Sequence, residues 1–184
     1  MGRKTSKDQP TDQRLPRLGV EPYLQLMGRT AAPETDAKSA HMGLVMLWLS
    51  DHILDVMDEE LASYGITESK LDLLLLLILH QDKGMITPSA IAARLGIRRA
   101  SATALLDWLE KRQWIAREQS DQDRRMIHVS ITPEGKELVE RLLPAFWRTC
   151  ASLVEVLEPE ERAVFEKVLL KLNDTIEKRL DAGR

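Results

Sequence analysis

Two arginine-rich stretches carry the side chains best suited to chemistry in this chain of 184 residues. The pair Arg98-Arg99 is followed closely by the hydroxyl side chains of Ser101 and Thr103. The second pair, Arg124-Arg125, lies in the stretch SDQDRRMIHVSITPEG, residues 120–135. A guanidinium group donates hydrogen bonds in a planar fork that fits phosphates and the edges of guanine bases. These residue types therefore predict binding to a polyanion rather than catalysis.

Arrangements typical of catalysis or of metal binding are missing from the sequence. It holds no phosphate-binding loop, no nucleophile elbow and no Cys–His spacing of a known catalytic type. The four histidines are not joined by a cluster of cysteines or histidines with metal-ligand spacing. We therefore expect a protein that is not an enzyme and that uses no catalytic residues, no cofactor and no metal.

Cysteine content and hydropathy point to the cytoplasm. Cys150 is the only cysteine, which excludes an intramolecular disulfide and fits a reducing compartment. The N-terminus is polar and charged, unlike that of a signal peptide. The longest apolar run, residues 73–79, is far shorter than the roughly 20 residues of a membrane-spanning helix. We expect a soluble cytoplasmic protein with no membrane partner.

Charge is unevenly distributed along the chain. The formal net charge is −3, which by itself disfavours a nucleic-acid partner. Residues 84–131, however, hold eight Lys or Arg against five Asp or Glu, a net charge of +3, whereas residues 41–83 hold two against eight, a net charge of −6. The middle segment is therefore where we expect the chain to meet a polyanion.

Helix start and stop signals divide this basic segment. Thr87-Pro88 predicts the start of a short helix that ends at Gly96. A second helix is expected from about residue 99 to residue 112, with one buried apolar stripe. The stripe consists of Ala102, Leu105, Leu106 and Leu109. Two short helices joined by a tight turn predict a helix-turn-helix.

A β-hairpin is expected directly after the second helix, with strands at residues 114–118 and 126–131. Alternation in the second strand places its isoleucines and its valine on one face, which suits packing on the helices. The charged tip is then free to reach a duplex, where arginines can enter the minor groove. Asp121 and Asp123 would repel phosphate, so we expect them to hold the arginines by local pairing. A hairpin in this place is a wing.

Long apolar helices are expected at both ends of this lobe. One covers residues 41–64, is closed by Gly65, and is apolar around nearly its whole circumference. Two more are expected at residues 133–157, where Pro144 should kink the helix, and at residues 159–180. This much apolar surface exceeds what a small monomer core can cover, which predicts a homodimer.

The expected fold class is mainly α, formally α+β: a winged helix-turn-helix with N- and C-terminal dimerisation helices. Residues 1–40 hold several prolines and no sustained period, so they are expected to form a flexible, mostly irregular arm with a short ordered piece around residues 23–27. The predicted single domain spans residues 41–184, with a DNA-binding lobe at 66–132 and dimerisation helices at 41–65 and 133–181.

Several short motifs, in a fixed order, resemble the winged-helix signature of MarR-type bacterial repressors. They are AARLGI at 92–97, LEKR at 109–112, WI at 114–115, DQDRR at 121–125 and ITPEG at 131–135. The Asp-x-Arg element of the family's wing corresponds to Asp123 and Arg125. The resemblance is strongest over about residues 67–143. The tryptophan before Ile115 and the LLP at 142–144 are similar to the members that repress multidrug efflux operons.

The resemblance implies a homodimer of triangular outline that presents two recognition helices to successive major grooves of a palindromic site in double-stranded DNA. It also implies a small effector, often a phenolic or other aromatic acid, held between the dimerisation helices and the DNA-binding lobe. One position departs from the family. Gln113 stands where glycine is usual, so an uncommon backbone angle or a different turn is expected there.

Candidate DNA-binding residues come from both arginine-rich stretches: Arg98, Arg99, Ser101, Thr103, Asp123, Arg124 and Arg125. Side chains at the start of a recognition helix can reach base edges. Alternatively, the two helix arginines contact only phosphates, which positions a protein without specifying a sequence. In the wing, one arginine could instead form a purely structural pair with an aspartate. Lys111, Arg112 and Arg117 are either further phosphate contacts or solvated surface.

Three side chains are candidates for ligand binding. Trp48 and His52 stand one helical turn apart in the first long helix, and Trp147 lies in the helix that contains Pro144. An aromatic acid could stack on a tryptophan and pair with the histidine. The alternative is that all three pack the dimer core. Cys150 is a weaker candidate, for redox sensing, because only Arg148 nearby could lower its pKa.

The function expected from these features is a ligand-responsive transcriptional regulator: a repressor that binds its operator as a homodimer and is released by a small aromatic or phenolic effector. A different class is a winged-helix interaction module that binds DNA weakly or not at all. The basic middle segment disfavours that class. A DNA-binding protein that responds to no ligand cannot be separated from the first alternative by sequence.

Overall fold

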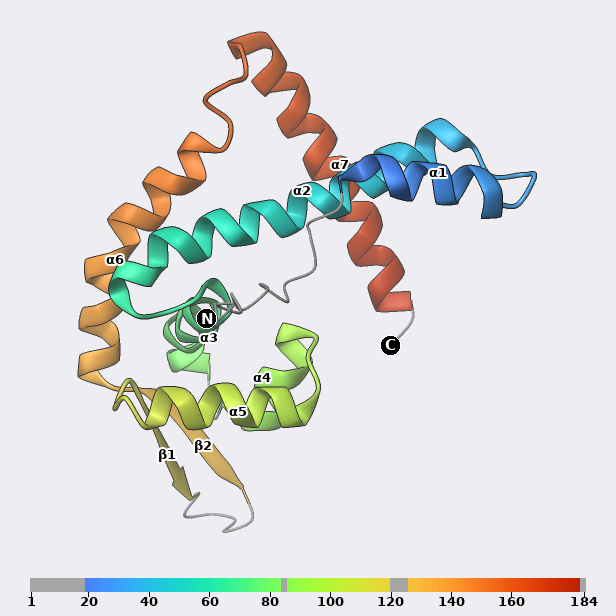
Figure 1. Cartoon of the computed structure of the whole chain (residues 1–184). Helices are drawn as coiled ribbons and strands as arrows, with labels where there is room; N and C mark the ends of the chain where they lie inside the picture. The colour runs from blue at the N-terminus through green and yellow to red at the C-terminus, as the bar shows by residue number, and fades with distance from the viewer. Residues whose placement is uncertain (1–18, 84–85, 120–125, 183–184) are drawn as a thin grey trace, which may run out of the picture. The chain divides into compact units, whose positions relative to one another are not determined.

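The computed structural model describes residues 19–83, 86–119 and 126–182. The chain is mainly helical, with one β-hairpin among the described residues (Figure 1). It divides into two compact units, residues 1–51 and residues 52–184. The boundary between the units falls inside a long helix, α2 (Ala37–Leu61).

The first unit contains helix α1 (Val20–Thr30) and the first part of α2. The ordered piece predicted around residues 23–27 is therefore longer, and residues 20–30 are helical rather than irregular. Helix α2 begins at residue 37 instead of 41 because Asp36 caps it, accepting hydrogen bonds at Oδ2 from the hydroxyl of Ser39 at 2.5 Å and from its backbone N–H at 3.0 Å. These bonds lower the pKa of Asp36. Residues 1–18 of the predicted arm lie outside the described residues.

In the second unit, α4 (Pro88–Leu95) packs against α5 (Arg99–Glu110) and forms the predicted helix-turn-helix. The hydroxyl oxygen of Thr87 caps α4 by accepting from the backbone N–H of Ala90 at 3.2 Å. Gly96 ends it with φ of +65°, a region that favours glycine. Both predicted signals for α4 are confirmed, and α5 ends two residues before the expected 112.

The wing consists of two antiparallel strands, β1 (Ile115–Gln119) and β2 (Ile127–Ile131), paired from Ile115 opposite Ile131 to Gln119 opposite Ile127. On β2, Val129 is buried while Ile127 is exposed, so only the inner part of the predicted apolar face is covered. The segment before α4 also joins the hairpin. The backbone N–H of Val129 donates to the carbonyl of Ile86 at 2.8 Å, and the N–H of Ile86 donates to Nδ1 of His128 at 3.2 Å.

Helix α3 (Glu68–His80), which carries the leucine run, is the centre of the core. Its five buried side chains are Leu71, Leu73, Leu74, Leu76 and Leu77. Other elements surround it with buried Leu61, Ile91, Leu106, Leu109, Val129, Leu138, Val139 and Leu142. Each buried leucine removes apolar surface from water and stabilises the fold by about 1.5–3 kcal/mol. This shared core fixes the helix-turn-helix relative to the wing.

Short 3-10 helices, Ala62–Tyr64 and Gln81–Lys83, follow α2 and α3. Gly65, with φ of +69°, closes the first of them, as predicted. The last two helices are α6 (Pro133–Ser152) and α7 (Pro159–Ala182). Pro144 lies within α6 without ending it.

The predicted end of α6 at residue 157 was wrong, because turns occupy residues 153–156. Arg162 stabilises this turn segment. Its Nε donates to the carbonyl of Leu157 at 2.8 Å and its Nη2 to the carbonyl of Glu155 at 3.1 Å. Across the part of the chain that the structure describes, no helix combines the length and apolar character needed to cross a bilayer.

Candidate nucleic-acid interface

The N-terminal end of α5 exposes the predicted recognition residues. Arg98 is the extended residue before the helix, with φ −68° and ψ 148°, and Arg99, Ser101 and Thr103 are exposed along the first turns. The opposite side of the helix buries most of the predicted stripe, with Ala102, Leu106 and Leu109 buried and Leu105 partly buried. Burial of that stripe anchors α5 and turns its polar residues outward.

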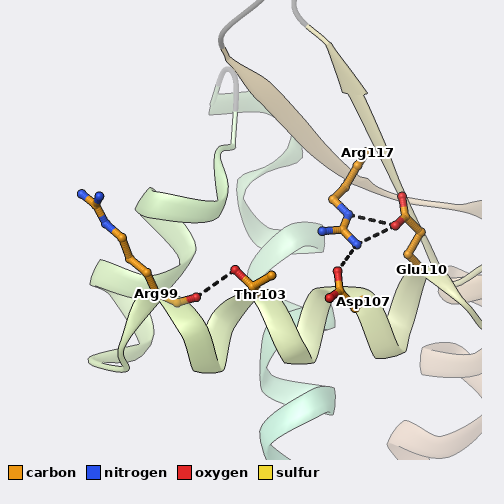
Figure 2. A network of polar contacts seen from close by, with 5 residues as sticks. All are labelled: Arg99, Thr103, Asp107, Glu110 and Arg117. Atoms are coloured by element: carbon orange, nitrogen blue, oxygen red, sulfur yellow. Dashed lines mark hydrogen bonds and ion pairs between the residues drawn. The ribbon is translucent and has the colours of Figure 1, made fainter.

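The Arg99 side chain extends away from α5, and the hydroxyl of Thr103 donates to the Arg99 carbonyl at 3.0 Å (Figure 2). The hydroxyl hydrogen of Thr103 is therefore used in a hydrogen bond within α5, although the hydroxyl oxygen can still accept a hydrogen bond. Among the described residues, no hydrogen bond or ion pair engages the guanidinium of Arg98 or Arg99. Both are exposed, so no contact with another described residue prevents them from binding an external anion.

Arg117, on β1, is engaged inside the protein. Its Nη2 lies 2.5 Å from Oδ1 of Asp107 and 2.6 Å from Oε2 of Glu110, and its Nε donates to the same Glu110 oxygen at 3.0 Å. Figure 2 shows the guanidinium between the two α5 carboxylates. The hydrogen bonds to Glu110 raise the pKa of Arg117; partial burial lowers it by less, and the hydrogen bond to Asp107 raises it further. This arginine is therefore neither a free phosphate contact nor simply solvated.

Two other cationic side chains lie against Trp108. The guanidinium carbon of Arg112 lies 3.4 Å from the centroid of the Trp108 ring, and Nζ of Lys70 lies 4.7 Å from the same ring. Trp108 in turn meets Trp114 edge-on, with centroids 5.6 Å apart. Cation–π contacts of this kind hold Arg112 at the end of α5, so its predicted phosphate contact would compete with the stacking.

The turn between α5 and β1 has the uncommon geometry expected at Gln113. This residue has φ of +61°, and it is the one non-glycine residue with positive φ among those described. Its backbone N–H donates to the carbonyl of Glu110 at 2.8 Å, and that of Trp114 donates to the carbonyl of Leu109 at 3.2 Å. The carbonyl of Gln113 accepts a hydrogen bond from the hydroxyl of Thr132 at 2.6 Å. The turn is thus tied both to α5 and to the start of α6.

The ITPEG motif completes this joint. Thr132 caps α6 by accepting from the N–H of Gly135 at 3.1 Å, and its own N–H donates to the carbonyl of Trp114 at 3.1 Å. A Cβ at Gly135 would collide with that same Trp114 carbonyl oxygen and would lie 2.9 Å from Cγ1 of Ile131. The motif therefore encodes a close approach of two backbone segments at the base of the wing.

The predicted wing-tip residues Asp123, Arg124 and Arg125 lie outside the described residues, and their contacts with DNA or with Asp121 stay predictions. Sequence reasoning missed the roles of Asp107 and Glu110, because their partner Arg117 is brought to them only by the path of the hairpin. The spacing of Asp107 and Glu110, three residues apart on one helix, was the available signal.

The three candidate ligand residues lie in different units. Trp48 belongs to the first unit and contacts Tyr23 edge-on, with ring centroids 5.9 Å apart. His52 and Trp147 belong to the second, and Trp147 is exposed and contacts Phe146 edge-on at 4.9 Å. Partial burial raises the pKa of Cys150, which disfavours the reactive thiolate. No cluster of potential metal ligands occurs in the part of the chain that the structure describes.

A helix-turn-helix followed by a two-stranded wing, with exposed arginines at the start of the second helix, defines a winged-helix protein. Residues 69–127 match the MarR family. The HTH-type transcriptional repressor YetL of Bacillus subtilis is 31% identical over 134 residues, which are 73% of this chain and 80% of YetL. The transcriptional repressor MprA of Escherichia coli K12 is 33% identical over 124 residues, which are 67% and 70% of the two chains.

Solved structures agree with these sequence relatives. The S. aureus MepR–DNA complex has a protein chain similar to this one, with a TM-score of 0.64 and 27% sequence identity, covering 72% of this chain and 96% of MepR. The chain belongs to the MarR family of winged-helix transcription regulators. The predicted family and fold class are confirmed.

Proposed function

We propose that this protein is a transcriptional repressor that binds a palindromic operator as a homodimer and is released by a small aromatic or phenolic effector. Two relatives above 30% identity are named as repressors, and a similar solved chain is bound to DNA. The single observation that carries the proposal is the two-sided character of α5. Its buried stripe fixes it to the core while Arg98, Arg99 and Ser101 are exposed at its start.

The homodimer is supported by the apolar surface of the terminal helices. No side chain of α7 between residues 159 and 180 is buried. Large apolar side chains are nevertheless frequent along it, with Val164, Val168, Leu169, Leu170, Ile176 and Leu180 exposed. In α2, the only buried residues are Met57 and Leu61, at its C-terminal end. Exposed apolar side chains in this number support an interface between two copies of the chain.

An aromatic effector is supported by the tryptophans. Trp48 lies beside Tyr23 in the first unit, where α1 and α2 enclose an apolar groove of about 610 Å³ lined in part by Tyr23, Leu26 and Leu47. An aromatic acid has the apolar face for such a surface. We assign Trp48, which lies in this unit, to the aromatic ring of the effector, whereas His52 and Trp147 stay predictions from the sequence.

The test is fluorescence anisotropy of the purified protein with a duplex from upstream of its own gene and with a scrambled duplex, each at several salt concentrations. We expect selective binding with a steep negative salt slope. Arg98→Ala should weaken binding and, if the arginine contacts a base, relax selectivity by roughly 1–3 kcal/mol at one position. Arg141→Ala, an exposed arginine on α6, is the matched control and should change little.

Weak binding that is equal for both duplexes and unchanged in Arg98→Ala would reject the repressor. It would favour the winged-helix interaction module. Addition of aromatic acids such as salicylate to the preformed complex then tests release. Trp48→Ala should desensitise the complex to the acid while DNA affinity in its absence stays the same. Selective DNA binding that no aromatic acid affects would favour a regulator without an aromatic effector.

A further inference from the structure

Arg117, Asp107 and Glu110 form a cluster, here called the wing clamp, that joins β1 of the wing to α5. We propose that the wing clamp positions the wing relative to the recognition helix, so that Arg117 supports operator affinity without touching DNA. This inference rests on the proposed DNA-binding function. It assigns to one arginine of the basic segment a role distinct from that of the others.

The geometry of the clamp suits positioning. Arg117 reaches two carboxylates one helical turn apart through Nε and Nη2, and its side chain is only 20% exposed, against 59% for Asp107 and 41% for Glu110. A planar guanidinium with both ends engaged cannot rotate without breaking several charge-assisted hydrogen bonds. The direction of β1 relative to α5 is therefore held by a side chain as well as by the hairpin ladder.

The wing clamp lies at a point where a small change in the angle between β1 and α5 would move the outer end of the hairpin considerably. The turn at Gln113 and the Thr132 hydrogen bond fix only the base of β1, whereas Arg117 lies two residues further out, at the middle of the strand. In the sequence, residues 120–125, which include Arg124 and Arg125, lie between β1 and β2. Rotation of the hairpin about its base would move the outer ends of β1 and β2 most, and DNA binding that depends on contacts from both the wing and α5 is sensitive to their spacing.

Three explanations of the cluster predict effects on DNA affinity that differ in sign. Asp107 and Glu110 are negative charges on the helix proposed to meet DNA, so simple charge repulsion predicts that neutralising them tightens binding. Positioning predicts that neutralising them weakens binding, although the protein becomes more positive, because Arg117 loses its partners. Direct phosphate contact by Arg117 predicts tighter binding too, since the freed guanidinium could reach the backbone.

The experiment measures the affinity of the Asp107→Asn/Glu110→Gln variant for the upstream duplex by anisotropy at several salt concentrations. We expect binding about three- to tenfold weaker than wild type, because part of the binding free energy would be used to hold β1 against α5. Arg117→Gln should weaken binding similarly with an unchanged salt slope. A tighter Asp107→Asn/Glu110→Gln complex, or a slope reduced by about one in Arg117→Gln, would overturn the clamp.

Glu118→Gln is the control for charge, because it removes one negative charge from an exposed residue next to Arg117 that is not part of the wing clamp. It should bind DNA as tightly as wild type or more tightly. Arg117→Glu/Glu110→Arg should recover part of the affinity that Arg117→Glu loses, and thermal unfolding of each free variant shows that it is folded. Wild-type protein that does not discriminate between the two duplexes would reject the proposed function and the clamp together. Selective binding by the wild type, with tighter binding by Asp107→Asn/Glu110→Gln, would reject the clamp alone.

Discussion

At the scale of single residues, the most informative position is Gln113, whose positive φ lies in a region that costs a residue with a Cβ about 1–3 kcal/mol. Its hydrogen bonds explain how this conformation persists. The N–H of Gln113, its carbonyl and the N–H of Trp114 are all engaged, by α5 on one side and by Thr132 on the other. The glutamine side chain contributes to none of these bonds, so strain remains that glycine would relieve.

We predict that Gln113→Gly raises the free energy of unfolding by about 0.5–1 kcal/mol, because relief of the left-handed strain exceeds the added backbone entropy of glycine in the unfolded chain. Urea-induced unfolding followed by circular dichroism measures the change. Gln113→Ala keeps the strain and should be close to wild type. A glycine variant less stable than the alanine variant would show that the side chain itself stabilises the turn.

At the scale of elements, helix ends marked by a local side-chain signal were predictable and those set by other contacts were not. Thr87-Pro88 and Gly96 predicted both ends of α4. The start of α2 was missed because several residues between 36 and 41 could begin a helix. In the structure, Asp36 caps the helix by accepting a hydrogen bond from the backbone N–H of Ser39. The end of α6 was missed because Arg162, from the next helix, binds carbonyls of the connecting turn.

Acidic side chains lie close to one another where α2 meets α3. Asp58 of α2 accepts from the backbone N–H of Glu68, the first residue of α3, at 2.6 Å. Partial burial, together with repulsion from Asp72 and Asp58, raises the pKa of Glu68. A raised pKa means that the folded state holds this proton more tightly than the unfolded chain does, so the charged form of Glu68 opposes folding at neutral pH.

We predict that Glu68→Gln is more stable than wild type at pH 7. The advantage should shrink as pH falls through the raised pKa, because the wild-type carboxyl is then protonated and the penalty disappears. Chemical unfolding between pH 4 and pH 8 provides the measurement. Glu134→Gln, at an exposed position in the first turn of α6, should instead lose about 0.3–1 kcal/mol of helix-dipole stabilisation at neutral pH. An advantage for Glu68→Gln that grows toward acid pH would contradict the assignment.

At the scale of the whole molecule, contacts within one chain explain why the core side chains are buried. They do not explain the apolar side chains that the terminal helices leave exposed. The leucines of α3 are buried by the helix-turn-helix, the wing and α6, whereas α7 leaves its apolar residues in water. The sequence pattern already indicated apolar surface in excess of a monomer's needs. It could not indicate the Arg117 contacts, since residues seven and ten positions apart meet only after the chain has reversed direction.

We predict that Leu169→Glu/Ile176→Glu converts a dimer into a monomer, raising the dimer dissociation constant by about tenfold or more, because two charges would be buried without partners. Sedimentation velocity over a range of concentrations measures the change. Lys167→Glu/Lys171→Glu places glutamates on the other side of α7 and should leave the assembly intact. A wild-type protein that sediments as a monomer at all concentrations would reject the homodimer.

The contact between Trp108 and Trp114 has an optical consequence. Two indole rings held edge-on at 5.6 Å and 63° couple their electronic transitions, and the coupled pair gives a circular dichroism band whose sign depends on their mutual orientation. One ring belongs to α5 and the other immediately precedes β1, so the pair spans the joint between recognition helix and wing. The protein therefore carries its own chromophore at that joint, and a spectrum taken without any label reports when DNA or an effector alters the angle there.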